Sequence, residues 1–102
     1  MTNFEEILKT KYNIEPYEYM KMVKKRAKEL GYVKKPEFSK DGKHKLEHLG
    51  VNFGNVNNKD YIIYLLTEGP EKANKMRKAY WARTFSPKRK ITTKMEYSLL
   101  NW

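Results

Sequence analysis

Apolar residues near the start of the chain recur every three or four positions, the spacing that places side chains on one face of an α-helix. The sequence therefore predicts a short, acidic helix over residues 3–12. Thr2 followed by Glu5 forms a capping box at its start. The apolar positions of this helix are Phe4, Ile7, Leu8 and Tyr12.

A second helix is predicted over residues 16–30, where apolar and basic positions are segregated by the helical period. Pro16 suits the first helical position, and Gly31 can end the helix in a left-handed conformation. The buried stripe is expected to consist of Met20, Val23, Ala27 and Leu30. The opposite face carries four lysines at the same spacing, namely Lys21, Lys24, Lys25 and Lys28.

Residues 37–54 change to short alternating segments, which indicates a small antiparallel β-ribbon of two or three strands. The dipeptide Asp41-Gly42 is a type I′ hairpin signal, and Gly50 permits a second tight reversal. Alternation then places His44, Leu46 and His48 on one face of the ribbon, and Lys43, Lys45 and Glu47 on the other.

The C-terminal half, residues 58–102, is predicted to be helical. The apolar run at residues 61–66 fits a buried strand or a buried helix, and the capping residues Asn58 and Asp60 favour a helix that Gly69 ends. Pro70 begins a longer helix to about Thr84, whose inward residues are expected to be Ala73, Met76, Ala79 and Tyr80.

A last helix is predicted to begin at a capping box of Thr93 and Glu96. Met95, Leu99 and Trp102 would line one side of it. A tryptophan at the end of the sequence indicates that this segment packs against the body of the protein.

These elements predict an α+β fold, a mostly helical single domain over residues 1–102 with a short antiparallel β-hairpin or ribbon in the middle. A chain of 102 residues has no room for a second domain. No apolar run approaches the ~20 residues of a membrane-spanning helix, so we expect no membrane as a partner.

The formal net charge is +10, from 22 Lys and Arg against 12 Asp and Glu, and the excess lies in two blocks. Residues 21–35 carry seven cations against Glu29 alone, and residues 72–94 carry nine cations and no carboxylate. A polyanion that touches both blocks is the natural partner of such a chain.

The sequence offers no convincing catalytic or metal-binding constellation. The only histidines, His44 and His48, would stand about 13 Å apart on a strand, too far for one metal ion without further ligands. We interpret both as surface or boundary residues of the ribbon. Cysteine is absent, and Asp41 and Asp60 are explained by a turn and a helix start. The chain is therefore predicted not to be an enzyme and to use no cofactor.

Nucleic-acid binding has positive evidence, because cations that neutralise phosphates release condensed counterions. Aromatic residues interleaved with cations can also stack on unpaired bases. The alternative is that the aromatic residues belong to the core and the lysines to ordinary solvated helix faces. The predicted contact residues are Lys21, Lys24, Lys25, Lys28, Lys72, Lys75, Arg77, Lys78, Trp81, Arg83, Lys88, Arg89 and Lys90.

The tetrapeptide SPKR at residues 86–89 resembles the Ser-Pro-basic-basic turns of histone tails and linker histones, whose cations enter A·T-rich minor grooves. It equally matches a proline-directed kinase site at Ser86, where a phosphate would cancel about two neighbouring charges. A plain exposed loop is the third interpretation, and all three stay open.

Several stretches follow one another in a specific order and spacing: YMKMVKKRAKELGY, DGKHKL, GVNFG, DYIIY, KANKMRKAYWAR and a final Leu-x-Trp. Through them, the chain from about Tyr19 onward resembles a family of short basic proteins encoded by large DNA viruses of protists. Two segments depart from the family pattern: NVNNK replaces a glycine-containing turn, and KITTKMEYS replaces an Asn-rich capping segment. That family has no assigned activity, so the resemblance implies a viral setting and no chemistry.

The leading hypothesis is a small viral DNA-binding protein, packaged in the virion, that coats or condenses the genome largely without sequence specificity. If about six to eight phosphates are neutralised, the affinity should fall with salt with a log–log slope of about −5 to −7.

The alternative is a structural or scaffold virion protein whose cations pair with an acidic protein partner. Expected partners are nucleic acid, with DNA favoured, and other virion proteins, with a homodimer left open. Expected locations are the virion and the host cytoplasm or nucleus during infection.

Overall fold

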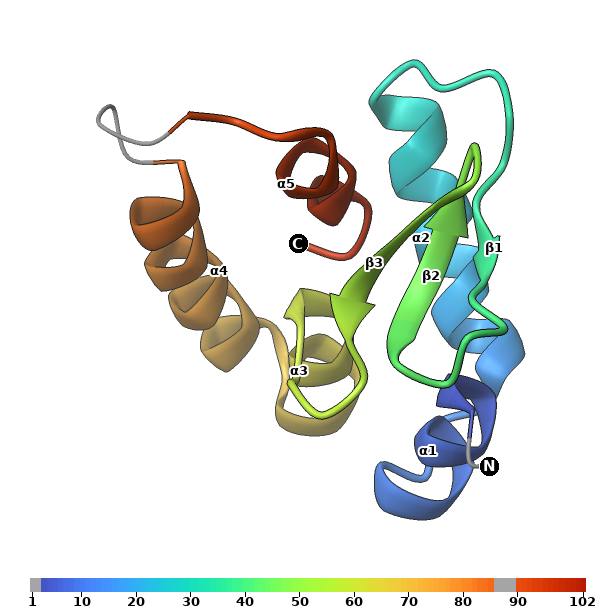
Figure 1. Ribbon diagram of the computed structural model, residues 1–102. Coiled ribbons are helices and arrows are strands. Elements are labelled where there is room, and N and C mark those ends of the chain that lie inside the picture. The colour runs from blue at the N-terminus through green and yellow to red at the C-terminus, as the bar shows by residue number, and fades with distance from the viewer. Residues whose placement is uncertain (1–2, 86–89) are drawn as a thin grey trace.

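The computed structural model of the protein describes residues 3–85 and 90–102. Along the chain, two helices precede a small sheet and the remaining helices follow it. The described residues form an antiparallel three-stranded sheet amid five α-helices, so the predicted α+β class is confirmed (Figure 1). The elements are α1 (Phe4–Lys11), α2 (Pro16–Glu29), β1 (Glu37–Phe38), β2 (His44–His48), β3 (Val51–Asn55), α3 (Tyr61–Glu68), α4 (Pro70–Thr84), α5 (Thr93–Tyr97) and a 3₁₀ turn, η1 (Ser98–Leu100).

The ends of the first two helices follow from local hydrogen bonds. The N-cap of α1 is Asn3, whose Oδ1 accepts from the Glu6 amide at 3.0 Å, so the prediction of a Thr2 capping box is wrong. Thr2 itself lies outside the described residues. After α2, Gly31 adopts a φ of 85°, and the amide of Tyr32 donates to the carbonyl of Ala27. This is the Schellman arrangement that the position of Gly31 predicts.

The sheet has the strand order β1-β2-β3, and its second hairpin turns on only two residues. Both of these residues, Leu49 and Gly50, have positive φ angles of 52° and 82°, as a type I′ turn requires. The type I′ turn predicted at Asp41-Gly42 is wrong, because only Gly42 of that pair has positive φ. There the Asp41 carboxylate accepts from the amides of Lys43 and His44, which closes a longer loop.

One hydrophobic core connects α1, α2, the sheet, α3 and the C-terminal segment. Phe4 packs edge-on against Tyr19 with ring centroids 5.0 Å apart, and Phe38 of β1 lies against both rings. Leu30, expected in the α2 stripe, is exposed, and Tyr19 is buried in the core. The stripe shifts because α2 ends at Glu29 and the chain turns away at Gly31.

His48 is buried, so its interpretation as a surface or boundary residue is wrong, whereas His44 is half-buried, as a boundary residue would be. The His48 ring lies 4.8 Å from that of Tyr32 and 4.7 Å from that of Tyr97, and its Nε2 contacts the carbonyl of Lys34 at 3.0 Å. A ring enclosed by two tyrosines is shielded from water even near the end of a strand.

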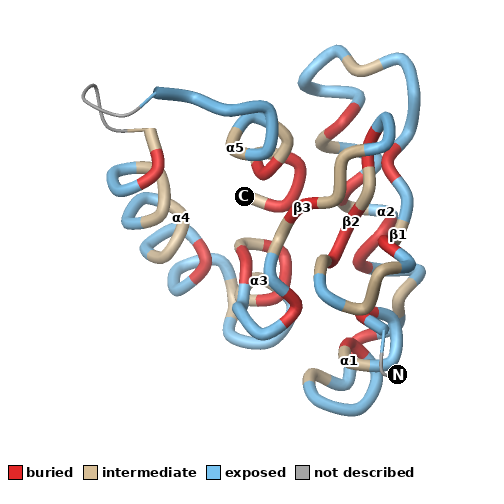
Figure 2. The backbone as a smooth tube through the Cα atoms, viewed as in Figure 1, coloured by how far each residue is buried: buried red, intermediate tan, exposed pale blue. Residues whose placement is uncertain are grey.

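In Figure 1, helix α4 lies on the opposite side of the molecule from β1, with β3 and α5 between them. It follows α3 after Gly69 and packs mainly against that helix. Only Ala73 and Thr84 of α4 are buried, and Ala79, expected to face inward, is exposed (Figure 2). A helix with charge on several sides can bury only a narrow strip of its surface. Helix α4 therefore contributes little to the hydrophobic core.

The C-terminal segment packs against α4. The N-cap of α5 is Thr92, one residue before the predicted cap Thr93, since the Oγ1 of Thr92 accepts from the Met95 amide at 3.2 Å. Trp102 stacks on Tyr80 with ring centroids 4.2 Å apart and planes 3° from parallel. The residues predicted to line the apolar side of this segment, Met95, Leu99 and Trp102, are only half-buried. The buried residues of this segment are Ser98, Leu100 and Asn101. The prediction that Trp102 packs against the body is confirmed.

Candidate nucleic-acid interface

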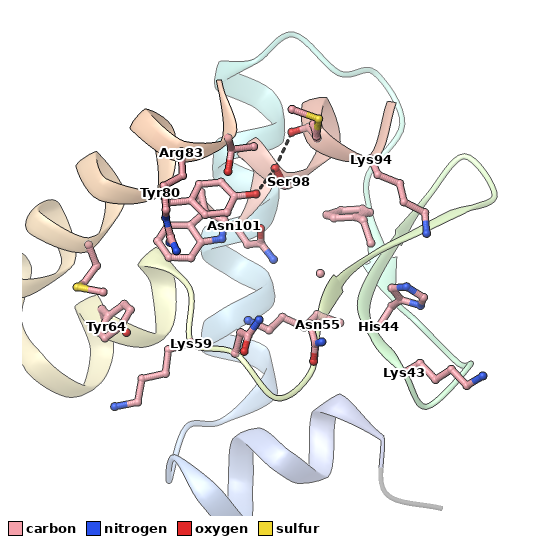
Figure 3. Close-up of a pocket in the computed structure, with 18 of the residues that line it drawn as sticks. Lys43, His44, Asn55, Lys59, Tyr64, Tyr80, Arg83, Lys94, Ser98 and Asn101 are labelled. Atoms are coloured by element: carbon pink, nitrogen blue, oxygen red, sulfur yellow. Dashed lines mark hydrogen bonds between the residues drawn. The ribbon is translucent and has the colours of Figure 1, made fainter. Parts of the chain in front are cut away.

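An open groove of about 1310 Å³ is lined by residues of α4, the sheet and the C-terminal segment, and we call it the basic groove. Four exposed cations lie on its rim, and they come from four different parts of the chain. Figure 3 shows Tyr80 and Arg83 of α4 on one side of this space and Lys43 and His44 on the other. No Asp or Glu side chain lines the groove among the residues described. The rim cations are Lys43, Lys59, Arg83 and Lys94.

The rim cations differ in how far they are already neutralised. Lys43 and Lys94 make no ion pair within the described part of the chain. The Nζ of Lys59 lies 3.1 Å from a Glu68 carboxylate oxygen, and this hydrogen bond raises the pKa of Lys59. Both partners of that pair are substantially exposed, so water and salt weaken the attraction and a phosphate can compete for the lysine.

Beside the rim, the Nδ1 of His44 lies 2.6 Å from an Asp41 carboxylate oxygen. Hydrogen bonds from His44, and from the backbone amides of His44 and Lys43, hold the pKa of Asp41 below its usual range. Asp41 therefore stays ionised at neutral pH and fixes the loop that carries Lys43.

Aromatic rings form part of the groove walls. Tyr64 comes from α3, Tyr80 from α4, and Trp102 from the C-terminal segment. The Tyr80 hydroxyl donates to Ser98 Oγ at 2.8 Å (Figure 3). The Tyr80 ring also stacks on that of Trp102. These contacts fix the walls before any ligand arrives. Rings held beside cations can stack on bases while the cations bind phosphates.

A buried polar cluster of Lys45, Asp60, Tyr19 and Asn101 lies beneath the groove. The Nζ of Lys45 contacts Oδ2 of Asp60 at 2.8 Å, and both side chains are almost fully buried. The Tyr19 hydroxyl donates to the same oxygen at 2.5 Å, and Asn101 Nδ2 lies 3.4 Å from that hydroxyl. The other oxygen of Asp60 caps α3 by accepting from the Ile63 amide. The cluster therefore ties β2, α2, α3 and the C-terminal segment together.

Gly54 gives Lys45 the space to reach this cluster. The register of β2 and β3 places the two residues opposite each other. A Cβ at Gly54, whose φ is 81°, would stand 3.3 Å from Asn101 Nδ2 and 3.4 Å from Cβ and Cδ of Lys45. A larger residue would therefore crowd the side chains that join the groove floor to the core.

The polar cluster supports a structural role better than proton transfer. Burial raises the pKa of Tyr19 well above its ordinary value, and the nearby charge of Asp60 raises it further. Tyr19 therefore remains a neutral phenol that donates to Asp60, whereas acid–base catalysis near neutral pH needs a tyrosine with a lowered pKa. Residues 3–85 and 90–102 contain no cluster of three His, Cys, Asp or Glu that could hold a metal ion.

Among the residues that the structure describes, the two predicted basic blocks share the lining of one groove. A second groove of about 280 Å³ lies between α2, α3, α4 and the C-terminal segment, and both Lys25 of α2 and Arg77 of α4 line it. The remaining lysines of α2 and α4 are exposed on the outer faces of these helices. They are Lys21, Lys24 and Lys28 on α2 and Lys72, Lys75 and Lys78 on α4.

Arg77 and Trp81 are half-buried and pack on each other. The Arg77 guanidinium lies 4.3 Å from the Trp81 ring centroid and 4.8 Å from that of Tyr61. Two ring faces beside one guanidinium stabilise the attachment of α4 to α3. The structure therefore gives both residues a packing role in addition to the predicted contact role.

Other predicted contact residues divide between the rim and the part of the chain not described. Arg83 lies on the rim of the basic groove. Lys90 is exposed and does not line the groove. Lys88, Arg89 and the rest of the SPKR element lie outside the described residues.

Sequence reasoning missed several groove residues, namely Lys43, Lys59, Lys94, Tyr64 and Trp102. Lys94 belongs to the second basic block, and Lys43 belongs to the basic stretch around His44, so weak signals existed for both. No local sequence pattern indicated that Lys43 and Lys94 would line the same groove as Arg83.

The fold and groove define a small α+β protein with a basic, aromatic-walled groove. No family model, curated protein or solved structure matches this chain. Among the described helices, none has the length and apolar character needed to cross a membrane.

Proposed function

We propose that this protein binds nucleic acid, with DNA favoured, by neutralising phosphates largely without sequence specificity. The basic groove is the main contact surface, and the exposed lysines of α2 and α4 extend the positive potential around it. A virion setting, with a role in coating or condensing a viral genome, is supported by the sequence resemblance to short basic proteins of large DNA viruses.

One observation carries this proposal: five Lys and Arg residues line the basic groove, and no Asp or Glu does so among the described residues. One of the five, Lys45, is buried and paired with Asp60. The other four, the rim cations, are exposed, and Lys59 among them also contacts Glu68. A concave surface of one sign concentrates the opposite charge and accelerates its association. Phosphates that replace condensed counterions at these cations gain free energy without reading the base sequence.

Salt dependence of the affinity tests the proposal. Each neutralised phosphate contributes about −0.7 to −0.9 to the log–log slope, so engagement of four or more rim and helix cations gives a slope of about −3 or steeper. Fluorescence anisotropy with a labelled DNA, from about 50 to about 200 mM salt, measures this slope.

A polyglutamate competitor separates the proposal from the scaffold alternative, in which the cations bind an acidic protein. Nucleic acid should bind more tightly than polyglutamate of the same total charge, because bases can also contact the aromatic walls. Equal binding of the two polymers would favour an acidic protein partner. A flat response to salt would contradict phosphate neutralisation itself.

A further inference from the structure

We propose that the basic groove accepts a single nucleic-acid strand, with its phosphates on the rim cations and unpaired bases against the aromatic walls. This inference rests on the proposed function and adds to it the form of nucleic acid that the groove selects.

The positions of the cations favour a strand that passes through the groove. Lys59 precedes the N-cap of α3, Lys43 precedes β2, Lys94 lies on α5, and Arg83 lies near the end of α4. A backbone that enters the groove would lie between these charges, as in a positively charged channel for a single strand. The outer lysines of α2, by contrast, line neither groove except for Lys25.

The aromatic residues favour unpaired bases. Tyr64, Tyr80 and Trp102 belong to the lining of the groove rather than to an outer helix face. In a duplex the faces of the bases are already stacked on one another, so rings inside a concave wall can be reached only by bases that have left a helix. Tyr80 and Trp102 are held parallel in advance, which lowers the entropy cost of forming a stacking platform.

Amide groups supply hydrogen-bonding capacity between the cations and the rings. Asn55 and Asn58 line the groove and are exposed. An amide can donate to or accept from a base edge. Cations, rings and amides in one groove are the combination that a single strand requires.

Binding of matched DNA forms tests this inference. The probes are a labelled oligothymidylate of about 16 nucleotides, the upper end of the site size for one small module, and a duplex of the same length. We expect the single strand to bind at least about tenfold more tightly than the duplex, with a salt slope of about −3 from four phosphates at about −0.7 each.

Two variants locate the contacts. The double variant Lys43→Gln/Lys94→Gln should reduce the single-strand salt slope by about 1.4, because two phosphate contacts are lost. Tyr64→Leu keeps apolar bulk but removes a ring, and should weaken single-strand binding about fivefold or more.

The matched controls are Lys9→Gln/Lys35→Gln and Tyr17→Leu. These residues are exposed, line neither groove and are not among the predicted contact residues. The lysine control removes the same charge as the groove variant, so it measures the general effect of charge. Circular dichroism of every variant verifies that the fold is retained.

Weaker single-strand binding in the groove variants, with the controls unchanged, would support the inference. Equal affinity for both DNA forms, with groove and control lysines contributing alike, would overturn the single-strand inference and leave the proposed function standing. Failure of both probes to bind would overturn the proposed function as well.

Discussion

Replacing Asp60 with asparagine is expected to lower the free energy of unfolding by about 3–5 kcal/mol. Asparagine has nearly the same shape and can still cap α3 at Ile63, so the change removes mainly the charge. Lys45 would then remain buried, with its Nζ 2.8 Å from a neutral amide in place of a carboxylate. Burying an uncompensated ammonium is far more costly than losing an exposed ion pair.

Urea denaturation followed by circular dichroism measures this loss. The control is Glu68→Gln, which breaks the exposed pair with Lys59 and should cost only about 0–1 kcal/mol. The double variant Lys45→Met/Asp60→Asn removes both charges and should be clearly more stable than Asp60→Asn, which keeps the comparison measurable if the single variant unfolds. A loss below about 1 kcal/mol for Asp60→Asn would contradict the importance of the buried pair.

Replacing Gly54 with alanine is expected to cost about 2–4 kcal/mol of unfolding free energy. About 1–2 kcal/mol arises because an L residue is strained at a φ of 81°. The rest arises because the new Cβ would meet Asn101 and Lys45 at 3.3 and 3.4 Å, both of which are held in the polar cluster.

Gly50→Ala provides the matched control for this prediction. Gly50 has a similar φ of 82°, but a Cβ there would meet nothing within 4 Å. It should therefore show only the conformational cost, about 1–2 kcal/mol. Thermal or urea unfolding of the two variants gives the difference, and equal losses would show that Gly54 provides no necessary space for Lys45.

Local signals in the sequence were sufficient for most of the secondary structure. Pro16 and Pro70 begin helices, Gly31 and Gly69 follow helix ends, and Asp60 caps α3 as expected. Each of these signals acts within about one turn of chain, so the sequence alone can reveal it. Errors at Asn3 and Thr92 are shifts of one residue between neighbouring capping side chains.

Long-range pairings could not be predicted in the same way. Lys45 and Asp60 are brought together by the turn of β3 into α3, and Tyr19 and Asn101 join them from opposite ends of the chain. Periodicity assigns a residue to a face, but it does not reveal which side chains meet there. The burial of Lys45 and His48 depends on such meetings, and so does the basic groove.

The charge blocks predicted a polyanion partner but not the surface that would hold it. The lysine face of α2 has the cleanest pattern in the sequence, yet most of it lies on an outer helix surface. The rim cations lie in three short segments and one helix end, where sequence pattern is weakest. Tertiary packing therefore decides which cations share a concave surface.

Nuclear magnetic resonance of the ¹⁵N-labelled protein during titration with oligothymidylate tests the central claim most directly, at a molecular mass of 12.3 kDa. We predict that the largest shifts fall on residues of the basic groove, including Lys43, Tyr64, Lys94 and the indole of Trp102. The amides of Lys9 and Tyr17, away from the groove, should remain nearly unchanged. Shifts confined to the outer face of α2, or no shifts at all, would contradict the assignment of the basic groove as the nucleic-acid interface.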